Sequence, residues 1–281
     1  MAHPSIRLLA VDLDGTLLPQ SKQILPRTRE ALRQAVQKGI HVVLASGRMP
    51  ASIGVYADGL ELTDPYAALN GAILAQQDGQ RLLRLPIPQP TLADLLRLLK
   101  QAGLPLQLYG DNHLFIQEPD EHLLRWFKRN AVKTGKKTTP AFRVTALGDA
   151  LFSAEAFREE IYKIAVFSGN KAEVEQLHRQ LVRFPVTVAS SAAHNLEITA
   201  PAADKGEALH FLCNHLQIPL EETMAIGDNT NDLPMLRAAG LAIAMGNAPA
   251  AVRNAAHWVT QDCEHDGVAI AVERFLFAPQ H

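Results

Sequence analysis

Two aspartates one residue apart stand directly behind an apolar run, in Asp12-Leu13-Asp14-Gly15-Thr16. The preceding residues 6–11 read as a buried parallel strand, and Gly15 lets the chain turn away sharply after it. In open α/β sheets, ligands bind at the edge where such strands end. Two acids there, with no basic residue beside them, are costly unless a cation or a reaction uses them. A turn capped by an aspartate is the alternative interpretation of this short motif.

A second acidic segment, Gly227-Asp228-Asn229-Thr230-Asn231-Asp232, follows another apolar strand pattern at residues 223–227. If the two strands are neighbours, their carboxylates converge, and a hard divalent cation would relieve the repulsion. Oxygen ligands without nearby His or Cys favour Mg²⁺ over Zn²⁺. The alternative interpretation is a helix N-cap at Asp232, and the two roles are compatible. The four expected carboxylates are those of Asp12, Asp14, Asp228 and Asp232.

Two further segments contain groups that suit a bound phosphate. Ser46-Gly47-Arg48 closes an apolar strand at residues 40–45 and offers a hydroxyl and backbone N–H groups at a strand-to-helix turn. A helix cap is the alternative interpretation of this tripeptide. Lys205 opens a predicted helix, where a lysine is unfavourable for the helix dipole. That placement favours a contact with an anion.

Strand and helix patterns alternate at both ends of the chain, which predicts right-handed βαβ units and a parallel sheet. The strands are expected at residues 6–11, 40–45, 66–69, 223–227 and 241–244, and the helices at 26–38, 205–216 and 268–275. On the first helix we place Leu32, Ala35 and Val36 on the buried face. These elements predict an α/β core with a parallel sheet.

The middle of the chain has a different character after the proline-rich connector at 86–90. Helices are expected at 91–102, 120–130 and 171–182, and strands at 106–109, 114–116, 161–167, 186–188 and 195–198. Hairpins mixed with helices are typical of an α+β module with an antiparallel sheet. We therefore predict a discontinuous catalytic core at 1–85 and 200–281, with an inserted domain at 86–199.

Composition narrows the class of protein. With 27 Lys and Arg against 29 Asp and Glu, the formal net charge is −2, so no basic field argues for a nucleic-acid or anionic-membrane partner. The two cysteines are too few for a disulfide framework and fit a reducing compartment. No apolar stretch approaches the length of a membrane span. We expect a soluble, cytoplasmic protein, as a monomer or homodimer.

Taken together, these segments resemble the haloacid dehalogenase superfamily of phosphohydrolases. The matching residues are D-L-D-G-T at 12–16, S-G-R at 46–48, a lysine that opens a helix at 205, and G-D-N-T-N-D at 227–232. Their order and spacing are similar to the Cof-type phosphatases, which carry a large α/β cap of the C2 type between the second and third motifs. Asn70-Gly71-Ala72 and Met245-Gly246-Asn247-Ala248 are similar to that branch as well. The resemblance implies a three-layer Rossmann-like core with an inserted cap.

The resemblance also implies a mechanism with Mg²⁺ as cofactor. Asp12 would be the nucleophile that forms an aspartyl-phosphate, and Asp14 the general acid and base. Asp12, Asp228 and the backbone carbonyl of Asp14 would hold the metal, with Asp232 orienting its waters. The phosphate oxygens would contact Ser46, Lys205, Asn231 and the backbone N–H groups of Leu13 and Gly47.

The function implied is hydrolysis of a small phosphate ester. Sugar phosphates come first among the expected substrates, followed by flavin mononucleotide and pyridoxal phosphate. One alternative is a phosphosugar mutase of the same superfamily, which shares the aspartyl-phosphate. Another is a non-catalytic protein that binds phosphorylated metabolites, although a pure binding site gains little from clustered acids.

Overall fold

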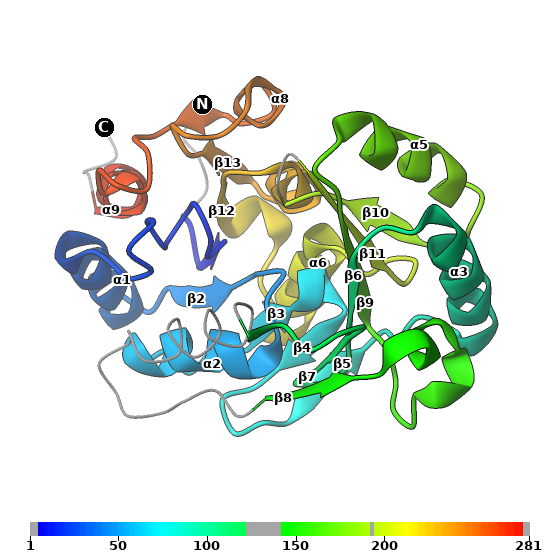
Figure 1. The fold of residues 1–281 in the computed structure, drawn as a ribbon. Coiled ribbons are helices and arrows are strands. Elements are labelled where there is room, and N and C mark those ends of the chain that lie inside the picture. The colour runs from blue at the N-terminus through cyan, green and yellow to red at the C-terminus, as the bar shows by residue number, and fades with distance from the viewer. Residues whose placement is uncertain (1–4, 122–141, 192–193, 278–281) are drawn as a thin grey trace.

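The computed structural model describes residues 5–121, 142–191 and 194–277. Two larger sheets dominate it, one built from both ends of the chain and one from residues 106–199 (Figure 1). The predicted helix at 120–130 lies almost entirely outside the described residues. No helix within the described ranges is long and apolar enough to cross a membrane.

A five-stranded sheet, in the order β14-β13-β12-β1-β2, forms the centre of the part that both chain ends build. All its neighbouring strands are parallel. The strands are β1 (Leu8–Val11), β2 (His41–Leu44), β12 (Thr223–Gly227), β13 (Leu241–Ala244) and β14 (Trp258–Val259). Val11 at the end of β1 lies level with Ile226 near the end of β12. The acidic segments after these two strands therefore leave the sheet side by side.

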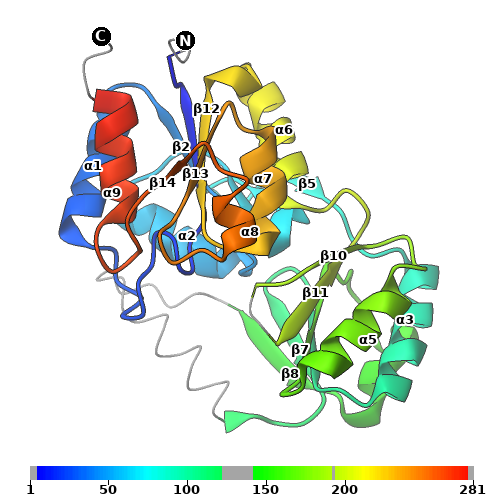
Figure 2. The ribbon, with the colours of Figure 1, turned by 90° about the horizontal axis from the view of Figure 1, so that it is seen from above.

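Helices cover both faces of this sheet, which gives three layers. Leu9 and Val11 belong to the apolar cluster that includes α1 and α9, whereas Leu8 and Ala10 belong to the cluster on α6 and α7. Figure 2 shows these helix pairs on opposite sides of the strands. The helices are α1 (Pro26–Gln37), α2 (Pro50–Gly59), α6 (Lys205–Leu216), α7 (Leu233–Ala238), α8 (Ala250–Arg253) and α9 (Gly267–Val272). This arrangement confirms the predicted Rossmann-like α/β core.

One detail of the predicted helices was wrong, and the last helix, expected at 268–275, is present in a mixed form. Val36 is 37% exposed, because it follows Ala35 by one residue and so points about 100° away from the buried stripe of α1. The last α-helix ends at Val272 and continues as a wider π-helical turn over Glu273–Phe277.

A small antiparallel sheet of β3 (Tyr66–Ala68), β4 (Ile73–Ala75) and β5 (Arg81–Arg84) leads out of the core. It adjoins the main sheet through a parallel bridge between Ala45 and Ala67. The turn between β3 and β4, residues 69–71, therefore lies near the end of β2.

The cap is a six-stranded sheet in the order β10-β11-β9-β6-β7-β8, in which only β7 and β8 are parallel. Its elements are α3 (Gln89–Ala102), β6 (Leu106–Tyr109), β7 (His113–Ile116), β8 (Arg143–Ala146), β9 (Lys163–Phe167), α5 (Lys171–Leu181), β10 (Thr187–Ala189) and β11 (Asn195–Thr199). Leu108 and Ile164 pack with α3 and α5 on the outer face. Tyr109 and Ala165 belong to the cluster shared with the core. The inner face of the cap sheet therefore faces the core (Figure 2).

Candidate active site

Three carboxylates meet at the edge where β1 and β12 end. Oxygen atoms of Asp12, Asp228 and Asp232 all lie within 4.8 Å of one another. All three residues are buried, with Asp232 completely so. Adjacent parallel strands bring the ends of distant segments together, so the expected convergence of the two acidic segments is present.

Lys205 lies between two of these acids. Its Nζ is 2.5 Å from Asp12 Oδ1 and 2.5 Å from Asp232 Oδ1, and the side chain is fully buried. Burial would lower the pKa of Lys205, but the charges of the two acids outweigh it and raise the pKa above its usual value. Lys205 therefore stays protonated, and it contacts only one of the two oxygens of Asp12. Asp204 caps the helix that starts here, accepting from the N–H groups of Gly206 and Glu207.

One ammonium does not balance three buried carboxylates. Burial first, and then the charge of Asp232, raise the pKa of Asp12 well above its usual value. The same two causes raise the pKa of Asp228 to about 6, against the opposing hydrogen bond from Thr16. Three carboxylates beside the ammonium of Lys205 leave negative charge in excess at this edge. The all-oxygen donor set and its excess charge fit a hard divalent cation such as Mg²⁺.

The surrounding side chains orient the acids. Asp232 Oδ2 accepts from the backbone N–H groups of Asp228 and Asn229, each at 2.9 Å, so this carboxylate braces the loop. Asp228 Oδ1 accepts from Thr16 Oγ1 at 2.9 Å, and its other oxygen is 3.3 Å from Asn247 Nδ2. Asp232 thus combines loop support with the Lys205 contact, in keeping with an indirect role toward a metal.

The carboxylate of Asp14 points to a different set of partners. Arg48 holds both of its oxygens, with Nε–Oδ2 at 2.5 Å and Nη2–Oδ1 at 2.6 Å, and Lys22 lies 2.8 Å from Oδ1. Burial alone would raise the pKa of Asp14, but the hydrogen bonds and charge of Arg48 and Lys22 hold it well below its usual range. In this arrangement the two basic side chains favour the ionised form of the Asp14 carboxylate. Its carboxylate lies outside the three-acid group, so the prediction that it converges with the other three carboxylates was wrong, because Arg48 and Lys22 hold it instead.

The turn after β2 lies beside this cluster. Ser46 is buried, and its Oγ accepts from the N–H of Arg48 at 3.3 Å. Within the described part of the chain, the Gly47 N–H has no hydrogen-bond acceptor. Asn231 is also buried, and its Nδ2 donates to Asn70 Oδ1 at 3.3 Å. The structure therefore brings the predicted phosphate-binding turn close to Asn70, which in turn contacts the acidic loop.

Several contacts at the site were not predicted from the sequence. Arg48, Lys22 and Thr16 fix the acids, and each is a common surface residue type whose partner is distant in sequence or only set by the fold. Lys163 and Glu197 come from the cap and contact the Gly47 carbonyl and the Asn70 side chain. Their only sequence signal is a charged residue within an otherwise apolar strand.

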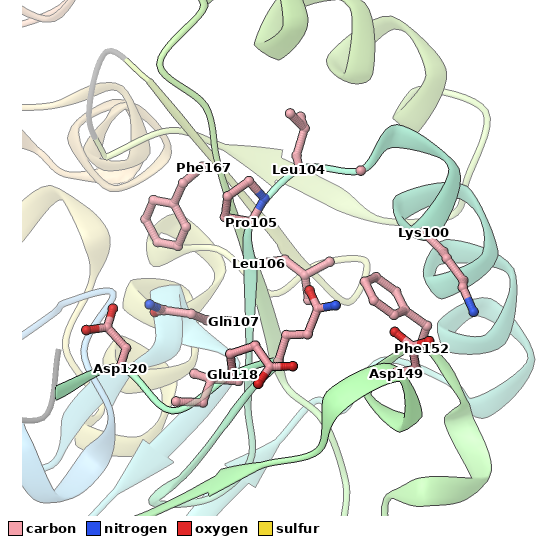
Figure 3. Close-up of a pocket in the computed structure, with 13 residues that line it drawn as sticks. Lys100, Leu104, Pro105, Leu106, Gln107, Glu118, Asp120, Asp149, Phe152 and Phe167 are labelled. Atoms are coloured by element: carbon pink, nitrogen blue, oxygen red, sulfur yellow. The ribbon is translucent and has the colours of Figure 1, made fainter. Parts of the chain in front are cut away.

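Two cavities differ in how they lie relative to the acidic site. A cavity of about 510 Å³ in the cap is lined, among the residues that the structure describes, by side chains that include Glu118, Asp120, Asp149 and Lys100 (Figure 3). None of these lining residues belongs to the acidic cluster or to the segments that carry it. A cavity of about 250 Å³ at the core–cap junction includes Asn70 and Asn231 and so adjoins the acidic site. The junction is therefore the better candidate for substrate.

Residues 9–272 match the family of haloacid dehalogenase-like hydrolases, so the chain belongs to this family. The resemblance noted in the sequence is thereby confirmed, together with the class of hydrolase. Phosphatase YwpJ of Bacillus subtilis is 30% identical, over 96% of this chain and all of that protein. Pyridoxal phosphate phosphatase YbhA of Escherichia coli is 26% identical, covering 94% of this chain and 96% of that protein.

A solved structure gives the same result for the fold. The HAD subclass IIB sugar phosphatase BT4131 superposes with a TM-score of 0.80 and is 26% identical. The match covers 96% of this chain and 98% of that one. Because both chains are matched almost completely, the likeness extends over the core and the cap.

Proposed function

We propose that this chain is a Mg²⁺-dependent phosphatase that hydrolyses small phosphorylated metabolites through an aspartyl-phosphate on Asp12. The convergence of Asp12 with Asp228, Asp232 and Lys205 at one sheet edge carries this proposal. The phosphatase names of the relatives support the phosphoric monoester class. In this proposal the core comprises residues 1–85 and 200–281, and the cap comprises 86–199.

In the first step, the free oxygen of Asp12 attacks phosphorus and the ester oxygen leaves. Mg²⁺, held by Asp12, Asp228 and the backbone carbonyl of Asp14, would supply the positive charge that lets a carboxylate approach a phosphate dianion. Ser46, Lys205, Asn231 and the N–H groups of Leu13 and Gly47 bind the phosphate oxygens. Lys205 already neutralises Oδ1 of Asp12, which leaves the other oxygen for phosphorus.

Asp14 transfers the protons. It protonates the leaving alkoxide and later takes a proton from the water that cleaves the aspartyl-phosphate. Because Arg48 holds Asp14 as an ionised carboxylate in this arrangement, the acid step requires the two side chains to separate. In this proposal, Asp14 and Arg48 separate when the substrate enters between cap and core.

Sugar phosphates are the proposed substrate class, supported by the full-length likeness to a sugar phosphatase. Pyridoxal phosphate is the second choice, supported by the relative from Escherichia coli, and flavin mononucleotide the third. We place the enzyme in the cytoplasm, as a monomer or homodimer without nucleic-acid or membrane partners. The scarcity of cysteine, with both residues free, supports a reducing compartment.

The test is phosphate release from p-nitrophenyl phosphate, followed by a panel of phosphorylated metabolites ranked by kcat/KM. We expect turnover with MgCl₂, its loss with EDTA and its return on adding MgCl₂. Hydrolysis without any sugar bisphosphate would exclude the mutase. Metabolite binding without release from any ester would overturn the proposal in favour of a binding protein.

A further inference from the structure

A buried pair of opposite charges in the cap touches the phosphate-binding side of the core. Lys163 begins β9, Glu197 lies on the neighbouring β11, and the two are 3% and 6% exposed. Lys163 Nζ lies 3.1 Å from Glu197 Oε1. Burying two charges is unfavourable unless further hydrogen bonds satisfy them. Both residues find such partners on the core.

Lys163 fixes one peptide unit of the turn after β2. Its Nζ donates to the carbonyl oxygen of Gly47 at 2.6 Å. The C=O and N–H of a trans peptide point in opposite directions, and the N–H of the same unit, that of Arg48, faces Ser46 Oγ at 3.3 Å. The contact also leaves no spare room, since a Cβ on Gly47 would lie 3.0 Å from Asn70 Oδ1 and 3.5 Å from Lys163 Nζ.

Glu197 fixes the side chain of Asn70. Its Oε2 accepts from Asn70 Nδ2 at 2.6 Å. Because an ionised carboxylate only accepts, the amide of Asn70 presents its NH₂ group to Glu197 and its oxygen to Asn231 Nδ2. The backbone N–H of Asn70 donates to the Ser46 carbonyl at 3.0 Å. Glu197 is therefore connected to both Ser46 and Asn231 through hydrogen bonds of Asn70.

We propose that Lys163 and Glu197 are positioning residues for the phosphate group. With the cap on the core, Lys163 orients the Ser46–Gly47 turn and Glu197 orients Asn231 through Asn70. The inference rests on the proposed function, in which Ser46, Gly47 and Asn231 bind phosphate oxygens. Its consequence is that the core alone presents an incomplete phosphate site, which the closed cap completes.

The experiment measures the affinity of the full chain for inorganic phosphate by calorimetric titration with MgCl₂ present. The variants are Lys163→Met, Glu197→Gln and the double variant, which leaves no unpaired charge and so remains folded where a single variant does not. We expect the phosphate Kd to rise about 10-fold or more, as for other groups that orient ligand-binding residues, and kcat/KM for p-nitrophenyl phosphate to fall in parallel.

Asp111→Asn is the matched control. Arg81 and Asp111 join the core strand β5 to the cap through two hydrogen bonds of 2.9 and 2.7 Å, and they contact neither Gly47 nor Asn70. We expect this variant to keep the phosphate Kd within about twofold of the wild type, less than 0.5 kcal/mol.

Two results would overturn the inference. One is a folded double variant with wild-type phosphate affinity and kcat/KM. The other is an equal loss in Asp111→Asn, which would mean that any loosening of the cap weakens phosphate binding. Failure of the proposed function gives a different result, namely a wild type that hydrolyses no ester, and the phosphate titration still decides between the variants in that case.

Discussion

Asp12 is the single residue on which the proposed chemistry depends, because its free oxygen is the nucleophile. Asp12→Asn keeps the shape of the side chain and removes the attacking carboxylate. We expect kcat for p-nitrophenyl phosphate to fall by about 10³-fold or more, as when other covalent nucleophiles are removed. Steady-state assays on purified protein measure this loss.

The same variant tests whether the loss is chemical. Burial and Asp232 disfavour the charged form of Asp12, so a neutral side chain at this position relieves repulsion. The free energy of unfolding should therefore fall by no more than about 1 kcal/mol. An active Asp12→Asn protein would refute the nucleophile assignment, and an unfolded one would refute the electrostatic account.

Lys205 has the opposite role. Among the residues that the structure describes, it is the one buried cation that contacts the three-acid cluster. Lys205→Met leaves Asp12 and Asp232 without their ammonium, and breaking a buried pair costs about 3–5 kcal/mol. Urea unfolding measures the change. Lys171→Met is the control, because its pair with Glu175 is exposed and worth at most about 1 kcal/mol. Equal losses in the two variants would show that Lys205 is not held as the structure indicates.

At the scale of elements, Gly15 in the turn after β1 sets how closely the acidic loop 227–232 can lie to that turn. Gly15 has a φ of +87°, and a Cβ there would lie 2.4 Å from Asp228 Oδ2. Gly39 has a similar φ of +80° with nothing within 4 Å. Alanine at either position incurs the left-handed strain of about 1–2 kcal/mol. Only Gly15→Ala also displaces the Asp228 carboxylate.

We therefore expect both variants to lose similar stability, while Gly15→Ala loses at least about 10-fold, or 1.4 kcal/mol, in Mg²⁺-dependent kcat/KM. Thermal unfolding and the p-nitrophenyl phosphate assay separate the two effects. If Gly39→Ala lost as much activity, backbone strain alone would explain the result and the close approach to Asp228 would not matter.

The strands of the core could be predicted because parallel strands buried on both faces are continuous apolar runs. β1, β2, β12 and β13 were all expected within two residues of where they occur. The bounds of α2 were not predicted beyond the strand-to-helix turn at 46–48, because the helix leaves no clear polar stripe: its buried residues are Pro50, Ile53, Val55, Tyr56 and Ala57. β14 is only two residues long and gives no periodicity.

The site residues also divide into those that the sequence predicts and those that it does not. Asp12, Asp228 and Ser46 follow directly on apolar strands, so strand ends alone predict their common edge. The partners of these residues depend on the tertiary structure, as with Arg48 and Asp14, which only the packing of neighbouring strands brings together. Lys163 and Glu197 required the docked position of the cap, which no local pattern encodes.

At the scale of the whole molecule, the cap is attached to the loops that do the chemistry. Asn229 and Thr230 of the acidic segment donate to the carbonyl oxygens of Ser191 and Ser190 at 2.9 and 2.8 Å. At the far end of the cap, Asn112 Oδ1 accepts from the Ala51 N–H in the first turn of α2. Because these contacts join both ends of the cap to loops around the site, opening the cap must disturb the site itself.

Glu197 makes part of this attachment sensitive to acid. Burial alone would raise the pKa of Glu197, but the charge of Lys163 and the hydrogen bonds from Asn70, Lys163 and Ser191 lower it below the usual 4.5. A carboxyl whose folded-state pKa is depressed stabilises the fold fully above its unfolded value and loses that contribution as the pH falls through the folded one. The stabilisation is therefore complete at pH 7 and disappears in acid.

The Tm difference between the wild type and Glu197→Gln measures this contribution, since the other titrating groups cancel. We expect the wild type to have the higher Tm at pH 7, and the difference to shrink as the pH falls below 4.5. Glu175→Gln, in an exposed pair, should show almost no difference at any pH. A difference that stays constant into acid would mean that Glu197 stabilises the closed cap by shape, and that its charge contributes nothing.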